Sequence, residues 1–219
     1  MRKLIFAMCA LVFWSACKFN NSNIKTLPIY GNRQAVTKVV NGQNVTDTVY
    51  QTIPPFKYIN QYGDSISDKD LAGKIYVADF FFTSCPSICP VMQRNMLKVY
   101  DAYKDTADVK ILSFTIDPKY DSVKVLKKYA DKLEVTGNMW WFIQGKRDDT
   151  YRLAEKSFLV AVSQDNTVPG GYVHQGYFVL VDKQKRVRGS YDGTNPKQVS
   201  QLIDDIKTLK AEPAPASTK

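Results

Sequence analysis

Strand-like and helix-like segments alternate along the chain from Ile53 onward, and this alternation constrains the fold more than any other feature. Apolar runs predict strands at residues 74–82, 109–117 and 138–145. Apolar residues at helical spacing predict helices at residues 89–104, 122–133 and 148–158. A hairpin at residues 177–193, turning at 182–185, and a helix at 196–210 complete the pattern. The alternation predicts an α/β fold in which helices cover a sheet of parallel strands.

Two cysteines, Cys85 and Cys89 in the stretch SCPSIC, follow the apolar run at residues 74–82. In a sheet of this kind a ligand lies beyond the carboxyl ends of the strands, where this pair is expected. Pro90 suits the first turn of a helix, and the partial positive charge at a helix N-terminus favours thiolate over thiol. The spacing lets both sulfurs face one small ligand. It also permits a disulfide, so a redox couple, a metal site and a structural disulfide all stay open.

The N-terminus has the layout of an export signal. Two basic residues, an apolar run at residues 4–14 and two small residues precede Cys17. The apolar run is about half of the ~20 residues that a helix needs to span a bilayer. The segment resembles the lipobox of a bacterial lipoprotein signal, with Trp14 in place of the usual Leu. It predicts a signal peptide at residues 1–16, a lipid on Cys17 and an exported, membrane-anchored lipoprotein facing the periplasm. An uncleaved membrane anchor and a plain secretory signal are the alternatives.

The two ends of the chain are expected to lie outside the fold. Residues 17–51 are interpreted as a tether and N-terminal extension, and the Pro- and Ala-rich residues 211–219 as a disordered tail. Cys9 leaves with the signal and Cys17 carries the lipid, so Cys85 and Cys89 remain as thiols. An exported compartment permits disulfides, which keeps the redox interpretation of the pair open.

The single histidine of the chain, His174, directly precedes the predicted hairpin and follows a Gly-rich turn. Histidine is the commonest metal ligand and also an acid or base near neutral pH. A single histidine in a loop is more often an exposed or packed residue that serves neither as a metal ligand nor as an acid or base. In a thioredoxin-like arrangement, however, the loop that enters the strand before the hairpin faces the cysteine pair. His174 is therefore a candidate third member of that site.

Three segments together resemble the Sco/SenC family: DFFFTSCPSICPVM, SFTIDP and YVHQGYFVLVDKQKRVRGSYDG. The resemblance covers roughly Thr52 to Leu209. It implies a thioredoxin-like domain at residues 52–210, with a central mixed sheet flanked by helices and a C-terminal hairpin and helix. Members of the family are membrane-tethered copper-binding factors that help to assemble the dinuclear copper centre of cytochrome c oxidase.

The resemblance also implies roles for particular residues. Cys85, Cys89 and His174 would bind copper, and Asp117 in the SFTIDP segment would orient or tune the site. The partner would be the copper-bearing subunit of cytochrome c oxidase or another copper protein. The family often has Asp before the histidine and Ser after it, where this chain has Val and Gln. These departures leave the choice of partner open.

The chemistry of the three side chains agrees with copper. Thiolates are soft ligands that select Cu(I), while imidazole suits Cu(II) and zinc. A structural zinc site normally has four protein ligands, and the sequence offers three convincing ones. Binding requires both cysteines reduced, so the affinity should depend on redox state and pH.

The cysteine pair has possible functions other than copper binding. A copper-binding factor of this kind is not an enzyme, whereas the first alternative is one. In a thiol–disulfide oxidoreductase that reduces partner cysteines, Cys85 and Cys89 would form the redox-active pair. A peroxiredoxin would have Thr or Ser three residues before the reactive cysteine and Pro seven before, where this chain has Phe82 and Ala78. A structural disulfide would close only a short loop, which contributes ~2–3 kcal/mol at most.

The remaining features are interpreted as surface or core. The formal charge of +9 comes from scattered basic residues, which indicates a solvated basic surface that anionic lipid could attract and disfavours nucleic acid as a partner. Met92, Met96 and residues 139–142 are expected in the core. The aromatic residues Phe80–Phe82 are expected to wall the site and limit the access of water.

Overall fold

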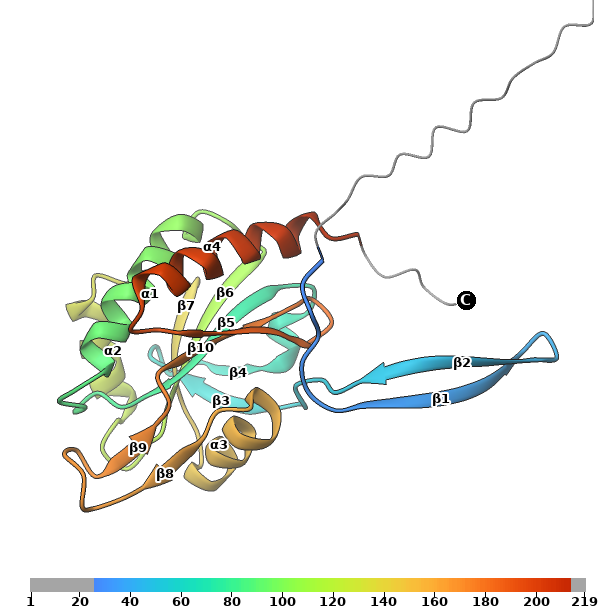
Figure 1. Cartoon of the computed structure of the whole chain (residues 1–219). Helices are drawn as coiled ribbons and strands as arrows, with labels where there is room; N and C mark the ends of the chain where they lie inside the picture. Colours follow the sequence, from blue (N-terminus) through green and yellow to red (C-terminus); the bar gives the residue numbers. More distant parts are fainter. Residues whose placement is uncertain (1–25, 214–219) are drawn as a thin grey trace, which may run out of the picture.

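A seven-stranded mixed sheet forms the centre of the molecule (Figure 1). The computed structural model describes residues 26–213. The strand order is β11-β10-β5-β6-β7-β3-β4. The strands of this sheet are β3 (Lys57–Asn60), β4 (Ser65–Ser67), β5 (Ile75–Phe81), β6 (Val109–Thr115), β7 (Trp140–Gln144), β10 (Tyr177–Val181) and β11 (Val187–Asp192).

The direction of the strands confirms the central mixed sheet that the family resemblance implied. The three central strands β5, β6 and β7 are parallel, as the alternation of strands and helices predicted. β10, β11, β3 and β4 pair antiparallel on the two sides of this centre, so the alternation was wrong only in predicting parallel strands throughout. The mixed α/β architecture with a C-terminal hairpin and helix is confirmed. The parallel centre places the carboxyl ends of β5, β6 and β7 at one edge.

Helices cover both faces of the sheet. The helices are α1 (Cys89–Tyr103), α2 (Val123–Lys132), α3 (Arg147–Leu153) and α4 (Pro196–Ala211). α1 and α4 lie side by side over one face (Figure 1). The helix predicted at residues 148–158 is an α-helix only as far as Leu153 and continues as a π-helix over Ala154–Phe158 on the opposite face.

Aromatic side chains fill the core on both faces because successive residues of a strand point to opposite sides. On the face covered by α1 and α2, Phe81 contacts Tyr129 and Phe142. On the other face Phe80 stacks on Phe114 and contacts Phe158. The residues expected in the core, Met92, Met96 and residues 139–142, are all buried.

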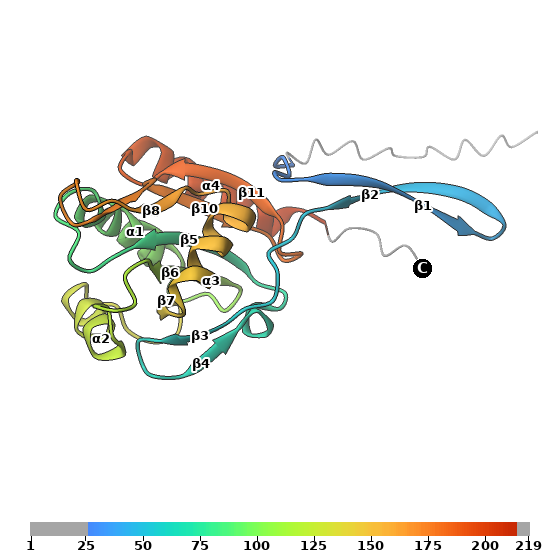
Figure 2. The same ribbon diagram turned by 90° about the horizontal axis from the view of Figure 1, so that it is seen from below.

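Two hairpins were not predicted from the sequence. β1 (Arg33–Val40) and β2 (Gln43–Tyr50) form a two-stranded hairpin that extends away from the body of the molecule (Figures 1 and 2). It lies within the extension expected at residues 17–51. β8 (Val162–Gln164) and β9 (Tyr172–His174) form a shorter hairpin beside α3 (Figure 1).

The proposed signal peptide at residues 1–16, Cys17 and residues 214–219 of the expected tail lie outside the described residues. Among residues 26–213, no helix combines the length and the apolar character needed to cross a bilayer.

Candidate metal centre

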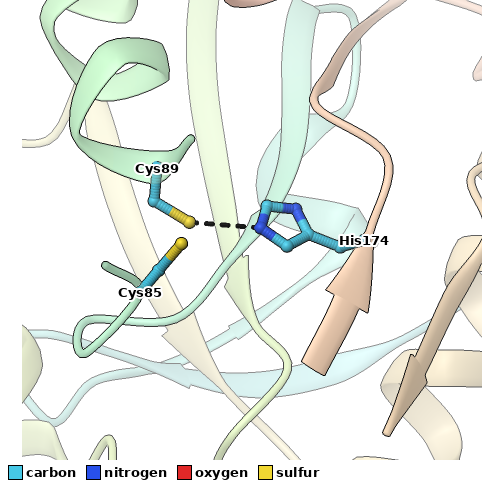
Figure 3. A group of neighbouring side chains, drawn as sticks. All are labelled: Cys85, Cys89 and His174. Carbon is cyan, nitrogen blue, oxygen red and sulfur yellow. Dashed lines mark hydrogen bonds between the residues drawn. The ribbon is translucent and has the colours of Figure 1, made fainter. Parts of the chain in front are cut away.

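Cys85, Cys89 and His174 come together at the edge of the sheet where β5 ends (Figure 3). Their ligand atoms all lie within 4.8 Å of one another. Sγ of Cys89 is 3.2 Å from Nε2 of His174, and both cysteines are free thiols rather than a disulfide. The structure thus brings His174 to Cys85, 89 residues before it in the sequence, and to Cys89.

A different element holds each of the three side chains. Cys85 lies in the loop after β5, where its backbone N–H donates to the carbonyl of Phe82. Cys89 is the first residue of α1, with Pro90 in the first turn as predicted. His174 is the last residue of β9, where it pairs with Val162 of β8. The position of the histidine therefore depends on the β8–β9 hairpin and not on the central sheet.

The site is buried, and Cys85 is its more accessible sulfur. Cys85 is 8% exposed, against 1% for Cys89, and His174 is 9% exposed. A cavity of about 240 Å³ adjoins Cys85 and His174 and is walled by Ile88, Val168 and Tyr172. A partner can therefore approach Cys85 first.

The two thiols share one proton unequally. The hydrogen bond from Cys89 lowers the pKa of Cys85 well below its ordinary value, and His174 and nearby backbone N–H groups add to this effect. The same hydrogen bond, together with burial, raises the pKa of Cys89. In the metal-free site Cys85 is thus the more readily ionised of the two thiols.

Of the three phenylalanines expected to wall the site, only Phe82 is in ring contact with it. Its ring is 5.8 Å from that of His174 in an edge-on arrangement and 5.1 Å from that of Tyr172. Phe80 and Phe81 instead fill the core on opposite faces of the sheet. The expectation was wrong for Phe81 because neighbouring strand residues point to opposite faces. It was wrong for Phe80 because this ring lies one strand repeat before Phe82 and packs on Phe114 and Phe158 in the core.

Asp79, a residue that the sequence analysis did not single out, lies fully buried on β5. It accepts hydrogen bonds from Ser113 at 2.5 Å and from Gln93 of α1 at 3.0 Å. Burial raises the pKa of Asp79 to about 6, against the lowering effect of these donors and of the nearby His174. A signal was present in the sequence, since Asp79 is the one charged residue in the run from Ile75 to Phe81.

Replacing Asp79 with Asn should change how stability depends on pH. Between about pH 4 and 6 the folded protein keeps a proton on Asp79 that the unfolded chain has lost, so raising the pH lowers the free energy of unfolding. The rise of this pKa from 3.8 to about 6 corresponds to about 3 kcal/mol. Urea unfolding at pH 4 and at pH 7 measures this effect. As the pH rises from 4 to 7, the free energy of unfolding of Asp79→Asn should increase by about that much relative to the unmodified protein.

The control for this measurement is Asp105→Asn, which removes an exposed carboxylate. Its unfolding free energy should run parallel to that of the unmodified protein across the pH range. If Asp79→Asn also ran parallel, Asp79 would not be the group that titrates in this window.

A second buried carboxylate, Asp121, fixes the loop that carries Cys85. It accepts hydrogen bonds from the backbone N–H and the hydroxyl of Thr83 and from the hydroxyl of Thr115 at 2.5 Å. Thr83 is two residues before Cys85, so this network sets where the loop leaves the sheet. No pattern in the sequence set Asp121 apart from other polar residues.

Asp117 lies outside the cluster of three. Its backbone N–H donates to the hydroxyl of Thr115, and its carboxylate lies close enough to the hydroxyl of Tyr172, two residues before His174, to affect the pKa of that hydroxyl. Burial, followed by this contact, raises the pKa of Tyr172 to about 12. The role implied for Asp117 stays a prediction, and the contact that could carry it is the one with Tyr172.

The donor set is suited to a soft metal ion. Two sulfurs and one imidazole nitrogen match copper, whose reduced state favours thiolates and whose oxidised state accepts imidazole. A structural zinc site would need a fourth protein ligand, and residues 26–213 offer no other His, Cys, Asp or Glu in this cluster. Nδ1 of His174 is buried and has no hydrogen-bond partner within the same residues.

Comparison with known proteins gives one consistent family. The SCO1/SenC family profile matches residues 44–211. The SCO1 protein homolog of Bacillus subtilis (strain 168) is 33% identical over 172 residues, which cover 76% of this chain and 87% of that protein.

Solved structures agree with this relationship. A SCO1/SenC family lipoprotein from Bacillus anthracis superimposes with a TM-score of 0.67 at 31% identity, covering 73% of this chain and 95% of that one. BsSco, described as a Sco-family cytochrome c oxidase assembly protein with a disulfide switch, gives 0.66 at 32% identity, covering 74% and 95%. These neighbours confirm the thioredoxin-like fold.

Proposed function

The chain belongs to the SCO1/SenC family, and on that premise we propose that Cys85, Cys89 and His174 bind copper for delivery to the copper centre of cytochrome c oxidase. The observation that carries the proposal is the convergence of two sulfurs and one imidazole within 4.8 Å, from a loop, a helix N-terminus and a separate hairpin. Copper is the metal that this donor set and the family membership support together.

Each ligand contributes differently to binding. The lowered pKa of Cys85 makes it the more readily ionised sulfur, so it offers a thiolate at the smaller cost of proton loss. Cys89 must release its proton before it can bind, so the affinity for copper should rise with pH. His174 supplies the nitrogen that Cu(II) prefers, whereas two thiolates suffice for Cu(I). The same three residues can therefore hold copper in both oxidation states.

The partner in this proposal is the copper-bearing subunit of cytochrome c oxidase or another copper protein. BsSco is described as an assembly protein of this oxidase. Copper is the cargo, and the cavity beside Cys85 is the side on which a partner's ligands would approach. The protein passes its cargo on without catalytic turnover.

One observation favours a second candidate function, reduction of a disulfide in a partner. The pair combines Cys85, the more exposed and more readily ionised sulfur, with Cys89, which is more deeply buried and has a raised pKa. The Cys85 thiolate would attack the partner disulfide, forming a mixed disulfide and releasing one partner thiolate. Cys89, losing its proton to that thiolate, would then displace the second partner sulfur and close the Cys85–Cys89 disulfide. Two electrons pass to the partner, and an external dithiol would restore the pair.

A copper titration tests the proposed function. Two samples of the mature chain are prepared, one with Cys85 and Cys89 reduced and one with the Cys85–Cys89 disulfide. Each is titrated with Cu(I) and with Cu(II) and followed by absorption and EPR. We expect one equivalent bound by the reduced protein, with a thiolate-to-copper charge-transfer band for Cu(II), and none by the oxidised protein. Failure of the reduced protein to bind copper, together with rapid reduction of a model disulfide, would favour the reductase.

We also propose that the protein is exported and anchored in the membrane by a lipid on Cys17. The signal-like residues 1–16 support this proposal, and the Bacillus anthracis relative is described as a lipoprotein. Cys17→Ser should move the protein from the membrane fraction to the soluble periplasmic fraction. The matched control is Cys9→Ser, which should leave the protein in the membrane because Cys9 is removed with the signal. Membrane association that persists in Cys17→Ser would refute the lipid anchor.

A further inference from the structure

We propose that the protein has a second binding site, for a phosphate-bearing ligand, in a cavity between β3 and the helical segment α3 with its π-helix. The cavity has a volume of about 600 Å³, within the range of about 300–1,000 Å³ that is usual for small-molecule sites. It shares no lining residue with the cavity beside Cys85. The site is thus separate from the metal centre and goes beyond the proposed copper function.

The cavity is lined by more positive charge than the protein itself neutralises. Four cations line it, and Asp149 is the one carboxylate that does. Asp149 is 2.5 Å from Arg152, which is thereby paired. Lys57, Lys146 and Lys156 have no ion pair within residues 26–213. Three unpaired ammonium groups around one hollow repel one another, and a bound anion relieves that repulsion.

A serine hydroxyl adds a directional group to this charge. Ser157 lines the cavity, and in the described part of the chain its hydroxyl makes no hydrogen bond. This hydroxyl can therefore donate a hydrogen bond to an oxygen of a bound phosphate.

The backbone that carries these groups is unusual. Lys156 and Ser157 belong to the π-helix Ala154–Phe158, a conformation that is rare and frequent at functional sites. The π-helix ends at Leu159, which has φ of 61° in the left-handed region that a side chain with Cβ avoids. Strain of this kind tends to persist where function requires it.

The charge and the walls together identify the class of ligand. Three free lysines match a doubly charged phosphate monoester better than a single carboxylate, and lysine binds phosphate as a point charge. The apolar walls, Pro54, Phe56 and Leu153, accept the carbon portion of the ligand. A neighbouring cavity of about 490 Å³ shares Lys57, Tyr58 and Lys146 and leaves room for a larger group. A soluble organic phosphate and a phospholipid headgroup share this chemistry.

Binding experiments with defined probes test the site. The mature chain with Cys17→Ser, which carries no lipid, is titrated with inorganic phosphate and with glycerol 3-phosphate. It is also floated with vesicles of phosphatidylcholine alone or with phosphatidic acid added. We expect saturable binding of the soluble phosphates or selective binding of the phosphatidic acid vesicles. The first result identifies a soluble ligand and the second a lipid headgroup.

Paired variants assign the binding to the cavity. Lys146→Gln with Lys156→Gln should weaken binding by at least about 10-fold, because the pair removes two charge-assisted contacts to the phosphate. The matched control is Lys124→Gln with Lys128→Gln, which removes the same charge from the exposed side of α2 and should change binding less than about 2-fold. Ser157→Ala should weaken phosphate binding without changing the net charge.

Copper binding provides the independent check of folding. All of these variants should bind copper as the unmodified chain does, which separates failure of this site from failure of the metal centre. Binding of none of the phosphate probes, or equal losses in the cavity and control pairs, would overturn the proposal.

Discussion

Replacing either Cys85 or Cys89 with serine should lower the affinity for Cu(I) by about two to three orders of magnitude. Metal-binding free energies of about 10–16 kcal/mol for four-ligand sites imply roughly 2.5–4 kcal/mol for each ligand. A serine hydroxyl stays protonated at neutral pH and is a hard ligand, so it cannot replace the thiolate. Because the sulfurs and the imidazole lie within 4.8 Å, removal of either sulfur leaves Cu(I) with an incomplete donor set.

Competition with a Cu(I) chelator under anaerobic conditions measures this loss. The matched control is Ser87→Ala, a substitution between the two cysteines that removes a hydroxyl 3.7 Å from the sulfur of Cys85. It keeps both thiols and should hold Cu(I) within about 10-fold of the unmodified protein. Undiminished affinity in either cysteine variant would mean that the metal is bound elsewhere.

The sequence predicts the fold correctly in those segments where the spacing of apolar residues determines the secondary structure. The buried strands β5, β6 and β7 and the helices α1, α2 and α4 follow from their apolar patterns. The hairpin β1–β2 was missed although it carries a signal. Asn41 and Gly42 at its tip both have positive φ, as a tight turn between antiparallel strands requires. Its strands are exposed on both faces, so no apolar period marked them.

The π-helix could not be predicted in the same way. The spacing of apolar residues at 148–158 fits a continuous α-helix, and nothing local specifies the wider turn at Ala154. Phe158 contacts Tyr76, Phe80 and Phe114 in the core. The position of Phe158 is thus set by tertiary packing, which the local pattern of apolar residues does not reveal.

The residues of the candidate site likewise fall into those that the local sequence reveals and those that only the fold brings together. The pair Cys85 and Cys89 was evident from spacing, but His174 became a candidate only through an expected topology and a family resemblance. The distances that matter join residues far apart in the chain, such as the 3.2 Å between Cys89 and His174. The buried carboxylates Asp79 and Asp121 were missed because their partners, Gln93, Ser113 and Thr83, are brought to them by the fold.

Replacing His174 with Ala should weaken Cu(II) binding far more than Cu(I) binding. The two cysteines come from the loop after β5 and from α1, so they stay in place when the imidazole is removed. Cu(I) can be held by two thiolates, whereas Cu(II) prefers a nitrogen donor as well. We expect a loss of about 100-fold or more for Cu(II) and less than about 10-fold for Cu(I). The removed ring also leaves the edge of Phe82 exposed to the site, which the fold itself should tolerate.

The two affinities are measured separately, by EPR and absorption for Cu(II) and by chelator competition for Cu(I). Gln175→Ala is the matched control, because this neighbour of His174 bonds through its side chain to the backbone of Ala161 and so perturbs the same hairpin. If the control reproduced the loss, the effect would come from a displaced β8–β9 hairpin rather than from a missing ligand. Equal losses of both oxidation states in His174→Ala would contradict the division of labour between imidazole and thiolates. A selective loss of Cu(II) affinity would show that the histidine determines which oxidation state the protein retains. That loss raises the Cu(II)/Cu(I) reduction potential of the bound copper and so favours Cu(I).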